Sequence, residues 1–133
     1  ILTKAYIYFV GVVSLTLTEY PAEMVFYITN KFCGRMEKLK KLVDGLSVVS
    51  NNIYEKKKNS CFSNKELFEY LKKINTQTIE FVGVDGNNCV GYSALVGREE
   101  FDVLFDLTCI GIGNMKKFQH TKEKLLKVGV TFL

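Results

Sequence analysis

The residues Thr78 to Leu95, TIEFVGVDGNNCVGYSAL, constrain the fold of this chain more than any other stretch. A short apolar run rich in β-branched and aromatic residues covers 78–84, which is typical of a strand buried on both faces. The turn residues Asp85 to Asn88 come next, and apolar positions at helical spacing follow them. The stretch therefore predicts a strand, a tight turn and a helix, with Cys89 in the first turn of that helix.

The first turn of a helix is a favourable place for a reactive thiol. Free backbone amides and the positive end of the helix dipole would stabilise a thiolate at Cys89. The alternative is that Cys89 is a small buried residue that packs the helix on the sheet, which is the commoner role of a free cysteine. These residues alone leave both interpretations open.

Length and composition indicate one globular domain over residues 1–133, because 47% of the residues are hydrophobic and only one is proline. The net charge of +4 is modest, and the lysine run 56–58 is typical of a solvated face. No aromatic residues interleave with these lysines as in nucleic-acid binding motifs, so we expect no nucleic-acid partner. The apolar segment 5–17 is too short to span a bilayer and lacks the flanks of a signal peptide. We therefore expect no membrane association.

The four cysteines and the one histidine say more about the compartment than about metals. The cysteines are spread along the chain without a C-x-x-C pair, and His120 is the only histidine. This pattern argues against a zinc site, so we expect no metal and no cofactor. An even count allows two disulfides, but a chain this apolar does not need them. We therefore expect reduced thiols and a cytoplasmic location.

The rest of the chain alternates between strand-like and helix-like segments. Residues 5–10 fit either the end of a helix or a strand, and residues 22–32 fit a strand or a short buried helix. We expect strands at 12–18, 46–50, 53–55, 101–107 and 130–133, and a glycine-bearing loop at 109–113. We expect helices at 36–46, after the N-cap Asn64 with Leu67, Phe68, Tyr70 and Leu71 inward, and at 118–127 with Leu125 and Leu126 inward. This alternation predicts an α/β fold with a doubly wound parallel sheet.

Residues 83–90, GVDGNNCV, followed by Ser93-Ala94, resemble the nucleophile segment of the isochorismatase-like cysteine hydrolases, a superfamily that includes the nicotinamidases. That segment usually reads G-V-x-T-D-x-C-V, so Gly86 and Asn87 stand where Thr and Asp are usual. The resemblance implies a three-layer, Rossmann-like parallel sheet with helices on both faces. Ligands of such sheets bind at the carboxyl ends of the strands.

A second segment, residues 53–62 with the sequence IYEKKKNSCF, is similar to the lysine segment of the same family. That segment is a short strand ending in Glu-Lys, three variable residues and then Ser-Ala-Phe. Aligning Ser60-Cys61-Phe62 with its end places Lys56 at the catalytic lysine, although a slip of one residue would choose Lys57 or Lys58. Without the resemblance, three solvated lysines at the end of a strand would be the better interpretation.

The resemblance implies a reaction as well as a fold. Cys89 would attack a small amide or a related carbon–nitrogen bond, and Lys56 would stabilise its thiolate. The backbone amides of Asp85 and Cys89 would hold the oxyanion, next to a cis peptide bond between Val84 and Asp85. The resemblance also implies a small-molecule substrate and, because relatives often oligomerise, a homo-oligomer.

The third catalytic group of the family, an aspartate in a D-x-Q-x-x-F pattern at the end of the first strand, is not found. We expect residues 11–21 to be the second strand, with the first strand and its aspartate upstream of Ile1, because this keeps the spacing to Lys56. Two other registers place Tyr27 or Val10 in the aspartate position. All three leave the chain without this aspartate, so a noncatalytic domain of the same fold, used for binding or assembly, is the alternative to a hydrolase.

Overall fold

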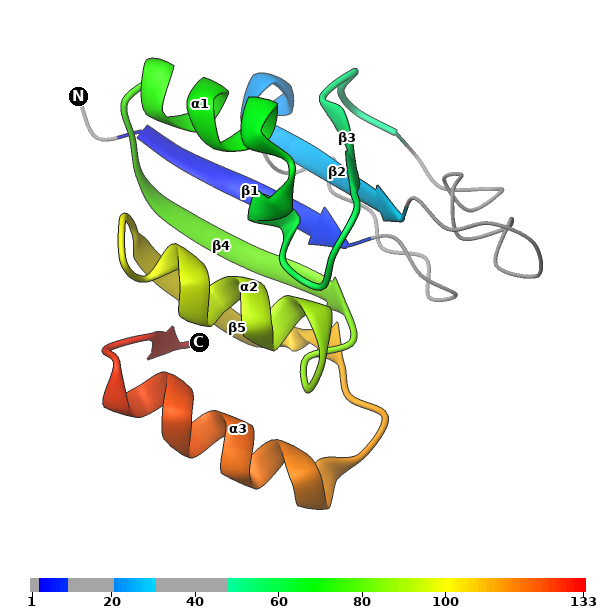
Figure 1. Cartoon of the computed structure of the whole chain (residues 1–133), viewed down its shortest axis with the longest axis vertical. Helices are drawn as coiled ribbons and strands as arrows, with labels where there is room; N and C mark the ends of the chain where they lie inside the picture. Colours follow the sequence, from blue (N-terminus) through cyan, green and yellow to red (C-terminus); the bar gives the residue numbers. More distant parts are fainter. Residues whose placement is uncertain (1–2, 10–20, 31–47) are drawn as a thin grey trace.

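The computed structural model describes residues 3–9, 21–30 and 48–133. Its described strands form a single parallel sheet with the order β3-β2-β1-β4-β5-β6 (Figure 1). The strands are β1 (Thr3–Phe9), β2 (Val25–Asn30), β3 (Ile53–Lys56), β4 (Thr76–Val84), β5 (Asp102–Gly111) and β6 (Thr131–Phe132). The α/β class and the parallel, Rossmann-like sheet expected from the sequence are confirmed.

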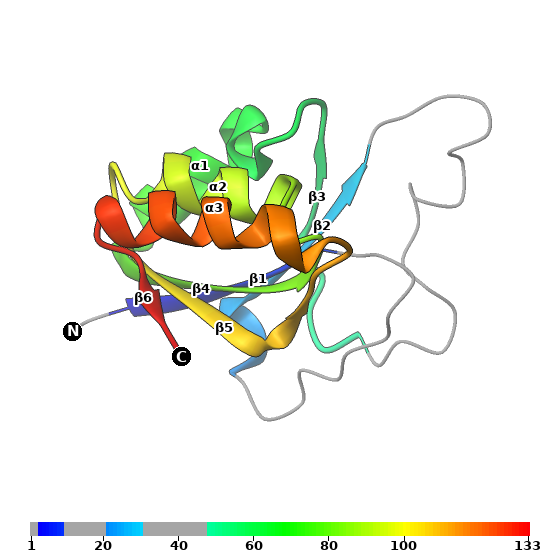
Figure 2. The ribbon, with the colours of Figure 1, turned by 90° about the horizontal axis from the view of Figure 1, so that it is seen from below.

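The helices of the described residues are α1 (Lys65–Lys73), α2 (Cys89–Gly97) and α3 (Met115–Lys127). All three pack on one face of the sheet (Figure 2). Two short 3-10 helices accompany them, η1 (Ala22–Met24) before β2 and η3 (Cys61–Ser63) before α1. The helix expected at 36–46 lies outside the described residues.

Strand β1 resolves the ambiguity at residues 5–10 and corrects the expected register. It lies in the middle of the sheet, where Phe9 is in register with Ile28 of β2 and with Gly83 of β4. The place beside β4 that we had assigned to a strand upstream of Ile1 is thus occupied by β1, and that register was wrong. The residue that follows β1 in the sequence is Val10, so the register with Val10 in the aspartate position agrees with the sheet. Residues 12–18 lie outside the described residues.

Both faces of the sheet are buried, which explains the continuous apolar runs in β2 and β4. On the helix face, alternate residues such as Ile7 and Phe9 join a large core under α1, α2 and α3. On the opposite face, Tyr8 belongs to a second cluster, in which it packs edge-on against Tyr27 with ring centroids 5.7 Å apart. Successive side chains of a strand point to opposite faces. When both faces are buried, the sequence lacks the apolar–polar alternation that identifies a half-buried strand.

The helices agree with the sequence predictions, except that two side chains expected to face the core are exposed. Asn64 caps α1 as expected, because its side chain accepts a hydrogen bond from the Leu67 amide at 3.2 Å. The prediction that Leu126 faces inward was wrong, because α3 buries a narrow stripe containing Phe118 and Leu125 and leaves Leu126 53% exposed. Tyr70 is also an exposed residue, although its ring lies 5.9 Å from that of Phe26.

Two of the expected boundaries differ in the structure. Residues 48–50 are irregular rather than strand, and β3 begins only at Ile53. The loop expected at 109–113 is largely strand, because β5 continues to Gly111 through a bulge. Between the pairs Phe81–Phe105 and Gly83–Ile110, β5 advances by more residues than β4. The Asp106 side chain supports the bulge by accepting hydrogen bonds from the amide and hydroxyl of Thr108, at 2.9 and 2.6 Å.

Gly83→Ala is expected to lower the free energy of unfolding by about 2 to 4 kcal/mol. Gly83 has a φ of +109°, and a Cβ there would lie 2.4 Å from the carbonyl oxygen of Phe9. Urea unfolding followed by circular dichroism measures the change. Gly113→Ala is the matched control. Its Cβ would lie 3.0 Å from a side-chain oxygen of Asp85, and a side chain can move aside where the backbone of Phe9 cannot. Equal losses in the two variants would contradict the account of Gly83.

Candidate active site

The turn between β4 and α2 is held by its own hydrogen bonds. The carbonyl oxygen of Asp85 accepts from the amides of Asn88 and Val90, both at 3.1 Å, and its carboxylate accepts from the Asn87 amide at 2.8 Å. The same carboxylate accepts from the Gly113 amide at 3.3 Å, which ties the turn to the loop after β5. The peptide bond between Val84 and Asp85 is cis, at the position that the resemblance implied.

Cys89 is the first residue of α2, as the sequence predicted. Its side chain is half-buried, and its Sγ donates to the carbonyl oxygen of Val84 at 3.4 Å. The amides of Asn87, Asn88 and Val90 close the turn by donating to Asp85, and the Gly86 amide donates to the Gly111 carbonyl oxygen of β5 at 2.9 Å. Among the hydrogen bonds between described residues, the backbone amides of Asp85 and Cys89 do not help to close this turn.

The two departures from the family pattern have structural partners in this chain. A Cβ on Gly86 would lie 2.7 Å from Cγ2 of Ile110, so a threonine at 86 would collide with that side chain. Asn87 uses its side-chain oxygen to accept a hydrogen bond from the Thr121 hydroxyl at 2.6 Å, which links the turn to α3. The departures are therefore accommodated in the packing around the turn.

Lys56 is the last residue of β3 and is only 6% exposed. Its Nζ donates to the carbonyl oxygen of Lys58 at 3.3 Å. Lys57 and Lys58 are exposed, so Lys56 is the buried member of the lysine run. A lysine is almost never this deeply buried without partners, which makes Lys56 unlike a solvated surface lysine.

The topology places Lys56 and Cys89 at the same edge of the sheet, although their strands are not neighbours. Both residues stand at or just after the carboxyl end of a strand, and β2 and β1 lie between β3 and β4. The chain after β3 bends toward the start of α2 before it enters η3 and α1 (Figure 1). η3 then contacts both β3 and α2, and the Cys61 amide donates to the Ser93 hydroxyl of α2 at 2.9 Å.

Cys61 is the fully buried first residue of η3, and the charges of both predicted catalytic residues affect its thiol. Burial raises the pKa of its thiol to about 12, and the charge of Cys89 acts in the same direction. A hydrogen bond with Ser93 and the positive charge of Lys56 oppose this rise in pKa. Lys56 and Cys89 thus both act electrostatically on Cys61, which places each of them in the vicinity of that thiol.

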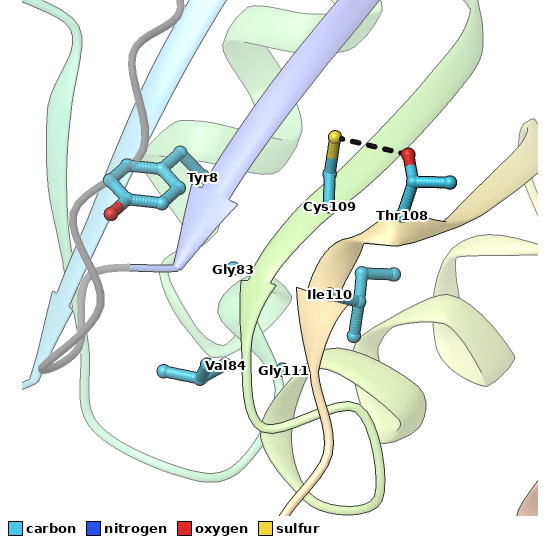
Figure 3. Close-up of a pocket in the computed structure, with 7 residues that line it drawn as sticks. All are labelled: Tyr8, Gly83, Val84, Thr108, Cys109, Ile110 and Gly111. Atoms are coloured by element: carbon cyan, nitrogen blue, oxygen red, sulfur yellow. Dashed lines mark hydrogen bonds between the residues drawn. The ribbon is translucent and has the colours of Figure 1, made fainter.

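A pocket of about 220 Å³ opens near the carboxyl ends of β4 and β5 (Figure 3). Tyr8 and Cys109 place it on the face of the sheet opposite the helices, and Cys89 and Lys56 are not among its lining residues. The bulge of β5 forms one wall, and Tyr8 stands on the opposite side. Val84 belongs both to this pocket and to the active-site turn. Cys109 lines the pocket with a half-buried thiol whose pKa is raised, mainly by burial and further by the charge of Asp106. Sequence analysis missed this pocket, because the bulge that forms it has no apolar pattern.

Neither a zinc centre nor a membrane segment is found in the part of the chain that the structure describes. His120 lies exposed on α3, and residues 3–9, 21–30 and 48–133 contain no group of three His, Cys, Asp or Glu side chains that could hold a metal ion. No helix within these ranges has the length and apolar content needed to cross a bilayer.

Comparisons with known proteins show the family and the fold of this chain. The model of the isochorismatase domain matches residues 24–105, which is more than half of the chain. This chain is therefore a member of the isochorismatase family. A search of the curated proteins found no match.

Solved structures with the same fold include three enzymes of this kind. The nicotinamidase of Staphylococcus aureus has a TM-score of 0.73 and 13% identity over 100% of both chains. An isochorismatase-like hydrolase from Alkaliphilus metalliredigens has a TM-score of 0.75 and 13% identity, covering 98% of this chain and 93% of its own. The pyrazinamidase of Pyrococcus horikoshii in complex with zinc has a TM-score of 0.73 and 12% identity over 98% of both chains. At these identities the likeness shows the fold.

The site contains two residues that sequence analysis did not single out. Cys61 stands in the Ser60-Cys61-Phe62 segment where the family has alanine, and this departure was a usable signal. Ser93 was noted only as part of a Ser-Ala pair, yet it is fully buried and binds the Cys61 amide. Its spacing of four residues from Cys89, one helical turn, was the signal for their proximity.

Iodoacetamide at neutral pH is expected to alkylate Cys89 before Cys61 and Cys109. Cys61 is inaccessible, and a pKa of about 12 leaves it almost entirely protonated at neutral pH. Cys109 also has a raised pKa, so its thiolate fraction increases only as the pH rises. Peptide mass spectrometry after short reaction times measures the order. In denaturant the three thiols should react alike, and uniform labelling of the native protein would contradict the description of the site.

Proposed function

We propose that this chain is a cysteine hydrolase that acts on a small amide or a related carbon–nitrogen bond, with Cys89 as the nucleophile. The observation that carries the proposal is the convergence of a half-buried cysteine at a helix N-terminus and a buried lysine at one edge of a parallel sheet. Cys89 is the first residue of α2, and the positive end of a helix dipole is a favourable place for an anionic sulfur. The Cys89 sulfur bonds to the carbonyl carbon, the carbon–nitrogen bond breaks, and the amine leaves with the proton of the thiol; water then cleaves the thioester and restores the thiol.

Lys56 is proposed to stabilise the negative charge at Cys89. An ammonium a few ångströms from a thiolate favours the charged sulfur. The burial of Lys56, in contrast to the exposed Lys57 and Lys58, supports the choice of Lys56 among the three. Its hydrogen bond to the Lys58 carbonyl oxygen restrains the ammonium at the end of β3.

The oxyanion of the tetrahedral intermediate is proposed to bind to the backbone amides of Asp85 and Cys89. Support comes from the hydrogen bonds of the turn, because Asn87, Asn88 and Val90 supply the donors that close it. These two amides stand at the two ends of the turn that leads to Cys89, and this turn is anchored to the loop after β5 and to α3. Donors held in place in this way stabilise a developing oxyanion without reorganising.

Small aromatic carboxamides are the first substrates to test, because the similar structures include enzymes named nicotinamidase and pyrazinamidase. We also infer that residues 1–133 form one domain. A cytoplasmic location and a homo-oligomer remain proposals from the sequence.

The second candidate function is that of a noncatalytic domain that binds a partner or a ligand. It is favoured by Val10, which follows β1 where the family has its aspartate. Without that proton carrier, hydrolysis loses general acid–base catalysis worth about 10² to 10⁴ in rate. Acylation by an activated ester is less sensitive to this loss, because its leaving group departs without a proton. The two candidates can therefore be separated by experiment.

Mixing the protein with p-nitrophenyl acetate is expected to give a burst of one p-nitrophenolate per chain, followed by slow turnover. The reason is that Cys89 can be acylated while deacylation lacks its general base. Stopped-flow absorbance measures the burst, and peptide mass spectrometry locates the acetyl group. Cys89→Ala should remove the burst and Cys109→Ala should keep it. A wild-type protein with no burst would favour the noncatalytic domain.

A matched pair of variants at Val10 then tests the missing group directly. Val10→Asp is expected to raise the steady-state rate, with the ester or with nicotinamide, by about 100-fold or more. Val10→Asn has nearly the same shape and cannot carry the proton, so its rate should stay at the wild-type level. Equal rates for the two variants would overturn the assignment of this position.

A further inference from the structure

We propose that Cys61 and Cys89 form a disulfide bond when Cys89 is oxidised by a hydroperoxide, so that the active site carries its own reversible protection. This goes beyond the hydrolase function and depends on the position of the two thiols, whether or not the protein turns over an amide. The relevant difference from the family pattern is that Cys61 replaces the alanine of Ser-Ala-Phe.

The pairing is supported by Ser93, which contacts Cys61 and lies on the same helix as Cys89. Its hydroxyl accepts from the Cys61 amide at 2.9 Å, and it also bonds to the Cys61 thiol. Ser93 follows Cys89 by four residues on α2, so the two side chains lie one above the other, with Cβ atoms about 5 to 6 Å apart. The backbone of Cys61 is thus held beside the turn of α2 that carries Cys89.

A disulfide of this kind needs one thiol that the oxidant can reach and one that it cannot, and the two cysteines differ in burial in this way. Cys61 is fully buried in the core of the helix face, and Cys89 is a partly buried residue packed against the same core. An oxidant from solvent therefore reaches Cys89 first. Cys61 stays protonated and unreactive toward outside reagents, because burial raises its pKa.

The chemistry proceeds in two steps. The Cys89 thiolate attacks one oxygen of the hydroperoxide, the O–O bond breaks, and Cys89 becomes a sulfenic acid while water or an alcohol leaves. The Cys61 sulfur then attacks the Cys89 sulfur, the S–O bond breaks, and water leaves with the Cys61 proton. The peroxide is reduced and the two thiols are oxidised to one disulfide. A dithiol reductant restores both thiols by exchange.

A protected nucleophile has a clear chemical advantage. An isolated sulfenic acid is oxidised further to sulfinic acid, which thiol reductants do not reverse. A neighbouring thiol diverts it to a disulfide. The alternative is a purely structural role, in which Cys61 is a small core residue and its thiol has no effect on the oxidation of Cys89.

The test is to treat the full chain with hydrogen peroxide and to map disulfides by nonreducing peptide mass spectrometry. We expect a Cys61–Cys89 linked peptide that dithiothreitol removes, together with recovery of iodoacetamide labelling at Cys89. Cys61→Ala should lose the linked peptide and accumulate sulfinic acid at Cys89. Cys109→Ala, the matched control, should retain the Cys61–Cys89 link.

Several outcomes would overturn the proposal. These are oxidation of wild-type Cys89 to sulfinic acid as fast as in Cys61→Ala, or a link from Cys89 to Cys33 or Cys109 instead. The wild-type map decides the matter even if Cys61→Ala folds poorly. Failure here is distinct from failure of the hydrolase proposal, because the ester burst is measured on the reduced protein.

Discussion

The position of Cys89 depends on two places where backbone segments lie too close together for a side chain to fit between them. A Cβ on Gly91 would lie 2.3 Å from the carbonyl oxygen of Gly86, and one on Gly83 would lie 2.4 Å from that of Phe9. These contacts press the first turns of α2 against the end of β4, and β4 against β1. Glycine is required at such approaches because any other residue would push the segments apart. The sulfur, the turn amides and the edge of the sheet are thereby held in one arrangement.

The second requirement is a cation at the same edge, and the fold meets it from a distant strand. β3 lies at the outer edge of the sheet, and the chain after Lys56 turns back toward α2 through η3, which contacts both β3 and α2. The Ser60 hydroxyl caps η3 by accepting from the Phe62 amide at 3.1 Å, and the Phe62 ring stacks on that of Phe101 at 6.0 Å. Ser93 then joins η3 to α2. A short polar link and an aromatic stack thus connect the lysine segment to the cysteine helix.

The sequence predicted most clearly the parts in which local and long-range preferences agree. The change from a β-branched run to a glycine turn and a helix located Cys89, and the N-cap at Asn64 located α1. The central strand β1 was ambiguous, because both of its faces are buried and the run from Ala5 to Phe9 has no polar period. The bulge in β5 was missed for another reason. It depends on the pairing of β5 with β4 and on the Asp106–Thr108 hydrogen bonds, which apolar periodicity does not record.

The central claim is that the Lys56 ammonium acts on the Cys89 sulfur, and one comparison tests it most directly. The second-order rate of iodoacetamide alkylation at Cys89 is measured in wild type, Lys56→Met and Lys57→Met, since methionine keeps the length of the side chain and removes the charge. Lys56→Met should slow the reaction by about tenfold, the effect of roughly 1.4 kcal/mol of lost charge stabilisation, and Lys57→Met should leave it nearly unchanged. Equal rates in all three proteins, or a larger effect at Lys57, would contradict the account.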